Sequence, residues 1–280
     1  MAGISLKEAQ FKKLSHFIES EVGIKMPPAK RIMLESRLQK RLRALSMESF
    51  ETYIEHVFNE DPGEIIHMID VVTTNKTDFF REPDHFVYLK ETLLPHHVEH
   101  DRWGLDGKFK VWSSASSTGE EAYTIAIELA EFQRSRNPRF DFRILGTDIS
   151  TAVLATAQKA VYPADRIAPV SPEFRKRYFL KSKNRDTELV RVKRALREKA
   201  QFHRLNLMAP TFPIRDRFHV IFCRNVIIYF DRLRQEQLLR KLYEYLVPGG
   251  YIFLGHSETL AGMDLPVVSV APTVYRRIEE

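Results

Sequence analysis

The spacing of apolar side chains changes character early in the 280-residue chain. Up to residue 72 they recur at helical intervals, as Phe11, Leu14 and Ile18 do in the first run, without the alternation typical of strands. This pattern predicts helices over about 5–23, 29–45, 49–59 and 64–72. We therefore expect residues 1–72 to form a small all-helical domain.

Beyond residue 90, predicted strands and helices alternate. Phe109, Val111 and Trp112 form a short apolar run that leads through six small residues and Gly119 into a helix ending near residue 135. The order continues with a strand at 143–146, a helix at 151–160, a strand at 220–223, an apolar run at 226–230, a helix at 231–246, a strand at 251–254 and closing strands within 267–277. Such alternation predicts an α/β fold with an open, Rossmann-like sheet.

Residues 162–205 interrupt this alternation. Short strand-like runs at 178–180, 189–192 and 201–205 are separated by polar residues, and 181–188 has the composition of a hairpin loop. We expect a small antiparallel β insertion on one flank of the main sheet.

A polar connector, residues 73–90, joins the two predicted domains. Phe79 and Phe80 are expected to anchor it against the larger domain, although the stretch could equally be a plain linker. Anchoring would leave three polar side chains free to face a cleft: Asn75, Thr77 and Arg81.

Composition narrows the class of protein. A hydrophobic content of 44% suits a globular core, and the most apolar stretch is interrupted by Arg224 and Asn225, which argues against membrane insertion. The single cysteine, Cys223, and the absence of a signal-peptide pattern predict a cytoplasmic location. One cysteine with scattered histidines predicts no metal site.

The charge indicates an anionic partner. The net charge is +6, and residues 25–43 contain seven Lys or Arg against the single acidic Glu35. A solvated helix face could explain this run, but its one-sidedness favours recognition of an acidic surface. Aromatic residues do not interleave with the basic ones, as they do on single-strand nucleic-acid platforms, so no nucleic acid is expected.

The first strand–turn–helix unit is the strongest candidate for ligand binding. Its small residues would let backbone N–H groups approach a ligand at the carboxyl edge of the sheet, although the turn is not G-x-G-x-x-G and could bind nothing. Asp148 ends the next strand, where such folds bind a ribose; the alternative is that residues 147–150 form only a helix N-cap. These features permit a nicotinamide dehydrogenase or an S-adenosylmethionine methyltransferase.

Four segments together resemble the chemotaxis receptor methyltransferases, the CheR family. They are TTNKTDFFRE (73–82), WSSASSTGEEAY (112–123), FCRNVIIYF (222–230) and GHSE (255–258). The chain departs from the family pattern at Ser116, Ser117 and Ala122, where the family often has glycine or cysteine and then proline. Small residues still allow close backbone approach.

The resemblance implies the organisation and the activity. It implies a helical domain (1–72), a connector contributing to the cofactor site (73–90) and a methyltransferase domain (91–280) with an inserted β subdomain (162–205). It also implies methyl transfer from S-adenosylmethionine to glutamate side chains in the cytoplasmic domains of chemoreceptors, forming glutamate methyl esters in chemotaxis adaptation.

Matching positions imply the roles of individual residues. Asn75, Thr77 and Arg81 would approach the methionine part of the cofactor, Ala115 and Glu121 would belong to the first turn, Asp148 would hold the ribose, Asn206 and Leu207 would flank the adenine, Arg224 and Asn225 would close the pocket, and Tyr229 would lie near the transferred methyl group. The basic residues expected to steer the receptor are Lys30, Arg31, Arg37, Lys40, Arg41 and Arg43.

The expected reaction needs no strong base, because a glutamate carboxylate with a pKa of about 4.3 is already ionised at neutral pH. Alignment and desolvation should lower the barrier instead. Arg81 is the candidate to orient the acceptor or the cofactor carboxylate, and Tyr229 the candidate donor to the acceptor. Methylation of RNA or another acidic target, and a non-catalytic S-adenosylmethionine-binding module, stay open as alternatives.

Overall fold

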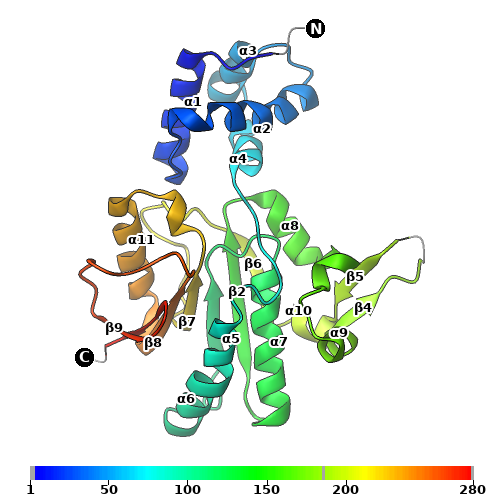
Figure 1. Ribbon diagram of the computed structural model, residues 1–280, viewed down its shortest axis with the longest axis vertical. Coiled ribbons are helices and arrows are strands. Elements are labelled where there is room, and N and C mark those ends of the chain that lie inside the picture. Colours follow the sequence, from blue (N-terminus) through cyan, green and yellow to red (C-terminus); the bar gives the residue numbers. More distant parts are fainter. Residues whose placement is uncertain (1–3, 185–186, 279–280) are drawn as a thin grey trace.

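The helical and the α/β parts of the chain form two bodies stacked along the long axis of the molecule (Figure 1). This arrangement is seen in a computed structural model that describes residues 4–184 and 187–278. The helical domain covers one end of the α/β domain, and a small antiparallel subdomain projects from one flank. No described helix is long and apolar enough to cross a membrane.

The helical domain has one core. Its elements are α1 (Glu8–Val22), the 3-10 turn η1 (Pro28–Lys30), α2 (Arg31–Ala44), α3 (Phe50–Glu55), the π-helical turn η2 (His56–Glu60) and α4 (Glu64–Val72). Leu34, Leu38 and Leu42 lie four residues apart on α2 and are all buried. Ser49 begins α3, where its hydroxyl accepts a hydrogen bond from the Thr52 amide at 3.1 Å. The four predicted helices are thus confirmed.

The α/β domain is built on a seven-stranded sheet in the order β6-β2-β1-β7-β8-β10-β9. The five strands from β6 to β8 are parallel, and β10 and β9 are antiparallel. The bounds are β1 (Phe109–Ser113), β2 (Phe142–Asp148), β6 (Ala200–Arg204), β7 (Phe218–Cys223), β8 (Leu246–Leu254), β9 (Val267–Ala271) and β10 (Val274–Arg277).

Helices cover both faces of this sheet. On β1, Val111 contributes to one apolar cluster and the neighbouring Trp112 to the other, as side chains alternate along a strand. Ile125 of α7 packs in the first cluster, and Leu238 of α11 packs in the second. The helices are α5 (Asp84–Tyr88), the π-turn η3 (Leu89–Leu93), α6 (Leu94–His100), α7 (Glu120–Ser135), α8 (Thr151–Lys159), α10 (Arg194–Arg197) and α11 (Arg232–Glu244).

The insertion is smaller than expected. Its antiparallel sheet has the order β3-β5-β4, with β3 (Val161–Pro163), β4 (Phe179–Lys181) and β5 (Leu189–Val192), accompanied by η4 (Ala164–Ile167) and α9 (Pro172–Tyr178). The interpretation of 201–205 as a third strand of the insertion is wrong, because β6 pairs in parallel with β2 in the main sheet. Phe202 is the only β6 side chain that is fully buried, so its local pattern carries little information about its partner. Two residues of the predicted 181–188 loop, 185 and 186, lie outside the described part of the chain.

Two segments near β7 and β8 depend on tertiary contacts. The apolar run 226–230, whose conformation the sequence pattern leaves open, forms a turn followed by the 3-10 helix η5 (Ile227–Tyr229), where the Glu258 carboxylate accepts backbone N–H bonds. β8 begins at Leu246 rather than after the glycines, and its register against β7 breaks around Pro248. Proline has no N–H for the ladder, so the regular pairing with β7 is interrupted there.

Candidate functional site

A pocket of about 240 Å³ lies where the carboxyl ends of β1, β2 and β7 face the helical domain. Strand order reverses between β1 and β7, which is where open α/β sheets bind ligands. Every residue that the resemblance assigned to the cofactor or the reaction lines this pocket: Asn75, Thr77, Arg81, Ala115, Glu121, Asp148, Asn206, Leu207, Arg224, Asn225 and Tyr229.

The turn after β1, residues 113–119, forms the first wall. Its backbone is tied to both neighbouring strands: the Ser114 amide donates to the Phe222 carbonyl at 2.9 Å, and the Ser116 amide donates to the Thr147 carbonyl at 2.8 Å. These bonds use only backbone atoms. The position of this wall is therefore set by the sheet itself.

Two residues of the turn have left-handed backbone conformations. Ser117 has φ +48° and Gly119 has φ +95°. At Gly119 a Cβ atom would lie 2.9 Å from the Ala157 Cβ, so glycine is required there for space as well as for conformation. The close packing of the turn against α8 depends on this glycine.

Asp148 lies at the end of β2 and is almost fully buried. Its carboxylate accepts the Ser117 amide at 2.9 Å and the Ser150 amide at 3.0 Å. Burial raises the pKa of Asp148, and these backbone bonds oppose that shift. The stretch 147–150 does contain the N-cap of α8, but the Ser150 hydroxyl provides it, so capping does not use the Asp148 carboxylate. The carboxylate oxygens keep lone pairs that can accept further bonds from hydroxyl groups in the pocket.

The connector forms the second wall. Phe79 is buried and packs edge-on against Tyr162 and Phe179 of the inserted subdomain, which confirms the predicted aromatic anchor. The Ser117 hydroxyl donates to the Asn75 carbonyl at 3.0 Å, so the two walls are in direct contact.

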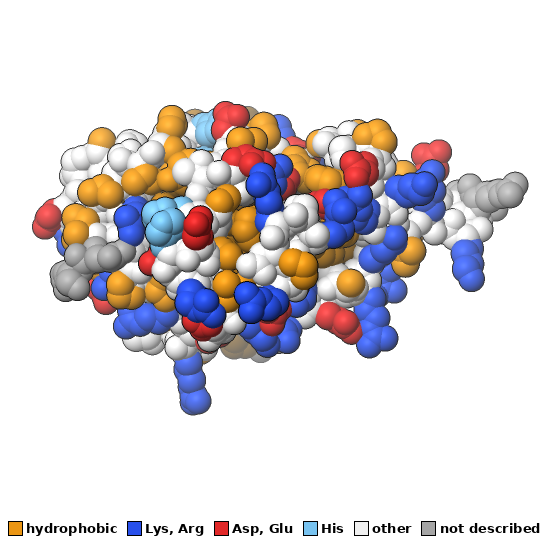
Figure 2. All heavy atoms as spheres, turned by 90° about the horizontal axis from the view of Figure 1, so that it is seen from below, with side chains coloured by type: hydrophobic (Ala, Val, Ile, Leu, Met, Phe, Trp, Pro, Cys, Tyr) orange, Lys and Arg blue, Asp and Glu red, His pale blue; other side chains and the backbone are white. Residues whose placement is uncertain are grey.

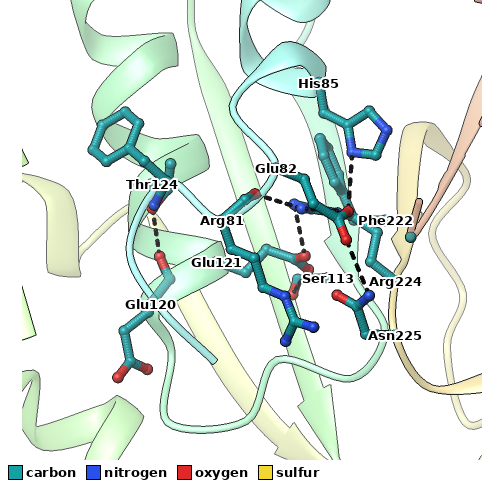
Figure 3. A network of polar contacts seen from close by, with 12 residues as sticks. Arg81, Glu82, His85, Ser113, Glu120, Glu121, Thr124, Phe222, Arg224 and Asn225 are labelled. Carbon is teal, nitrogen blue, oxygen red and sulfur yellow. Dashed lines mark hydrogen bonds and ion pairs between the residues drawn. The ribbon is translucent and has the colours of Figure 1, made fainter. Parts of the chain in front are cut away.

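Arg224 is the centre of a network that joins the connector to the sheet (Figure 3). Its guanidinium donates to Glu82 Oε2 at 3.1 and 2.8 Å, to Glu121 Oε2 at 3.2 Å and to the Arg81 carbonyl. The Asn225 amide nitrogen donates to Glu82 Oε1 at 3.1 Å. The Arg224 side chain is only 2% exposed, and each of its nitrogens donates within this network. Arg224 therefore braces the pocket wall.

The two carboxylates beside Arg224 differ in their pKa values. Burial acts to raise the pKa of Glu82, but the Arg224 charge and hydrogen bonds from Asn225, Arg224 and His256 outweigh it and bring the pKa from 4.5 to about 2. Burial also raises the pKa of Glu121, and there the Arg224 charge does not overcome it. Glu82 is thus the firmly ionised partner of Arg224.

Arg81 and Tyr229 line the pocket from different parts of the chain, the connector and η5. Figure 3 shows the Arg81 guanidinium directed away from the Arg224 network, and its one hydrogen bond within the described chain goes to the Lys76 carbonyl at 2.9 Å. Tyr229 belongs to η5, and its carbonyl accepts the Lys25 amide of the helical domain at 2.9 Å.

Asn206 contacts the helical domain as well as the pocket. Its amide nitrogen donates to the Glu21 carbonyl at 2.7 Å, and its amide oxygen accepts the Met208 amide at 2.9 Å. Leu207 is nearly buried in the cluster beneath α11. Asn206 therefore links the carboxyl side of β6 to α1.

Sequence reasoning missed two contributions to the site. The helical domain supplies part of the pocket lining, including Ile24, Met26 and Met33. Glu258 holds the loop after β7, because its buried carboxylate accepts the amides of Asn225 and Gly255 at 2.8 and 2.7 Å. The only sequence signal for Glu258 is its place in the GHSE segment (255–258), one of the four segments that resemble the family.

The basic helix α2 is only partly a free surface. Arg41 forms two 2.7 Å bonds to the buried Glu64, which also accepts the Tyr53 hydroxyl at 3.0 Å. Arg37 donates to the Val72 and Thr73 carbonyls at the end of α4. The exposed basic residues of the predicted set that remain on α2 are Arg31, Lys40 and Arg43, of which Arg31 also pairs with Glu8 at 3.6 Å. Lys30 of η1 is half-buried and donates to the Lys25 carbonyl at 2.8 Å. On the end of the molecule away from this domain, Lys and Arg are interspersed with Asp and Glu (Figure 2).

Two groups of described residues have ligand atoms close enough for a metal ion: Glu82, His85 and His256, and His96, His97 and Asp101. The first lies against the Arg224 guanidinium, which opposes a cation. In the second, His97 is already bonded to Asp101 and to the Tyr251 hydroxyl at 2.8 Å.

The chain matches two protein-family models in succession. Residues 9–73 match the CheR methyltransferase all-alpha domain, and residues 75–275 match the CheR methyltransferase SAM binding domain. The boundary between the two falls inside the connector, and each match includes residues that line the pocket.

Curated relatives match along almost the whole chain. The chemotaxis protein methyltransferase of Borreliella burgdorferi is 34% identical over 98% of this chain and 96% of the relative. Those of Salmonella typhimurium and Escherichia coli are each 36% identical over 97% of this chain, and over 91% and 92% of the relatives.

Proposed function

Because the chain belongs to the CheR methyltransferase family and carries its S-adenosylmethionine-binding domain, we propose that it methylates glutamate side chains in the cytoplasmic domains of chemoreceptors. The product would be a glutamate methyl ester. One observation supports the proposal most: three of the four segments that resemble the family, 73–82, 112–123 and 222–230, contribute lining residues to a single pocket, which the helical domain also lines.

The side chains around the pocket suit S-adenosylmethionine. Asp148 offers a carboxylate for ribose hydroxyls, Ile149 and Leu207 offer apolar contact for adenine, and Arg81 offers a cation for the methionine carboxylate or for the acceptor. When bound, the cofactor supplies an electrophilic methyl group on a positively charged sulfur.

The acceptor glutamate would be ionised on arrival, so the chain need only place and desolvate it. Glu121 takes no part in this step, because its carboxylate already accepts hydrogen bonds from the Ser113 hydroxyl at 2.6 Å and from Arg224. Arg81 and Tyr229 are the groups that we assign to orienting the acceptor carboxylate, because both line the pocket and present a donor.

Receptor recognition would use the free basic surface of α2. We expect association with a receptor fragment to slow as ionic strength rises, because charged surfaces steer encounter. The double variant K40Q/R43Q should lower the association rate constant several-fold without lowering stability. Arg41→Gln is the comparison variant: it should instead destabilise the fold by about 3 kcal/mol, because the buried Glu64 carboxylate loses its paired cation and keeps only the Tyr53 hydroxyl. Association that is insensitive to salt would contradict this surface.

The test of the activity is transfer of a labelled methyl group from S-adenosylmethionine to purified receptor signalling fragments, with mapping of base-labile esters. We expect label on glutamates, and none on a fragment whose acceptor glutamates are replaced by alanine. Label on RNA instead, or binding of S-adenosylhomocysteine with no transfer to any receptor, would overturn the proposal. Calorimetry with S-adenosylhomocysteine against NAD checks the ligand independently.

A further inference from the structure

The short stretch that presents Arg81 is held in an unusual backbone conformation. The residues on either side of it, Phe80 and Glu82, both have φ +56°, in the left-handed region that non-glycine residues rarely adopt. Such a conformation is disfavoured and persists only where the surrounding structure enforces it. Contacts elsewhere must therefore hold this stretch in place.

The Glu82 carboxylate supplies the strongest of these contacts. Its two oxygens accept from Arg224 at 2.8 and 3.1 Å, from the Asn225 amide nitrogen at 3.1 Å and from the His256 backbone amide at 3.3 Å. These donors follow the carboxyl ends of β7 and β8. Glu82 thus fastens the connector to two central strands of the sheet.

Arg224 extends this attachment to Arg81 itself. The same guanidinium that binds the Glu82 carboxylate also donates to the Arg81 carbonyl, so one side chain holds both residues of the Arg81–Glu82 peptide. On the other side, the Phe80 amide donates to the Thr124 hydroxyl of α7 at 3.1 Å. Arg81 is therefore held between two anchored residues, while its side chain lines the pocket and is directed away from the Arg224 network (Figure 3).

Glu82 itself is not among the residues that line the pocket, whereas Arg81 is. We infer that Glu82 is a positioning residue for the methyl-transfer reaction: its carboxylate holds the strained turn that aims Arg81 at the reacting groups. This inference rests on the proposed function, because it takes Arg81 to act on the acceptor or the cofactor. Nothing in it requires Glu82 to touch either ligand.

A double-mutant cycle tests the inference. Glu82→Gln keeps the size of the side chain but removes its charge, and we expect kcat/KM for receptor fragments to fall at least ~10-fold, since a displacement of about 1 Å can change a rate up to 10²-fold. In an Arg81→Ala background the same substitution should change the residual rate by less than about 2-fold, because residues that act through one another are not additive. A purely structural role would give the same factor in both backgrounds and would overturn the inference.

Glu131→Gln is the matched control. Glu131 also accepts a hydrogen bond from an arginine, Arg134, at 2.7 Å, but it lies about 16 Å along α7 from Glu120, at 1.5 Å per residue. Its effect on kcat/KM should be the same, and small, with or without Arg81. If Glu82→Gln does not fold, Glu82→Asp, which retains the charge, replaces it in the same cycle.

Amide hydrogen exchange separates this inference from the proposed function. Exchange across 78–84 should accelerate in Glu82→Gln and not in Glu131→Gln. Absence of glutamate esters with the unmodified protein would overturn the proposed function, whereas unchanged exchange in 78–84 would overturn the anchoring role of Glu82 whatever the substrate is.

Discussion

The two walls of the pocket keep their shape by different means. The turn 113–119 is held by backbone hydrogen bonds to adjacent strands and by a glycine that packs on α8. The pocket-lining part of the connector, residues 73–82, is held by contacts between side chains that are remote in sequence. Glu82 and Arg224, for example, are 142 positions apart. The comparison indicates that damage to the turn should act mainly on stability, whereas damage to the connector should act mainly on turnover.

The largest effect is expected at Arg81. Arg81→Ala should lower kcat for receptor methylation by about 10²-fold or more, because a charged group aimed at the reacting atoms is lost. Stability should fall by less than about 1 kcal/mol, because one hydrogen bond is removed. Steady-state kinetics and urea unfolding measure the two quantities.

The control for Arg81 is Arg143→Ala, which also removes a single bond to a backbone carbonyl, that of Glu198 at 2.7 Å. Its kcat should match that of the unmodified protein. A near-normal rate for Arg81→Ala would remove Arg81 from the mechanism and erase the contrast between the walls.

Next in size is Gly119 in the turn. Gly119→Ala should destabilise the fold by about 3 kcal/mol, because the new Cβ would lie 2.9 Å from the Ala157 Cβ at a φ of +95°. Gly107→Ala is the matched control, since a Cβ there meets nothing within 4 Å, and its unfolding free energy should be unchanged. Equal stability of the two variants would show that the turn is looser than its packing indicates.

Acidification should weaken the attachment of the connector, which is intact at neutral pH. The folded pKa of Glu82, about 2, lies below its ordinary value of 4.5, so this carboxylate contributes stability above pH 4.5 that is lost as pH falls towards 2. Glu82→Gln should therefore lose less unfolding free energy than the unmodified protein between pH 5 and about 3. Glu48→Gln, at an exposed position, is the control and should keep the original pH dependence. Identical slopes for all three proteins would contradict the strong Glu82–Arg224 pair.

The smallest effect concerns the contact between the walls. Ser117→Ala removes the 3.0 Å bond to the Asn75 carbonyl and should weaken S-adenosylhomocysteine binding about 5-fold, equivalent to roughly 1 kcal/mol for one hydrogen bond. Ser135→Ala removes a comparable bond within α7, to the Glu131 carbonyl, and should leave the affinity unchanged. An unaltered affinity for Ser117→Ala would mean that each wall keeps its position independently.

Predictions from the sequence were most accurate where local signals are strong. The four helices of the N-terminal domain, the first strand and its turn, and the buried aromatic anchor at Phe79 follow from spacing and side-chain size. The partner of β6 and the turn at 226–230 could not be predicted this way, because a parallel strand pairs with a remote segment and Glu258 organises the turn from another loop.

The sequence by itself determined the two-domain order, the small-residue turn before Gly119 and the carboxylate at the end of the second strand, since periodicity and residue size are local properties. Only the tertiary structure decided that Arg224 and Glu82 brace Arg81, that Arg41 belongs to the core of the helical domain, and that the helical domain closes the pocket. The physical reason is that an ion pair between remote residues forms only after the sheet has brought them together. A charged residue has the same appearance in the sequence whether it faces solvent, a substrate or a buried partner.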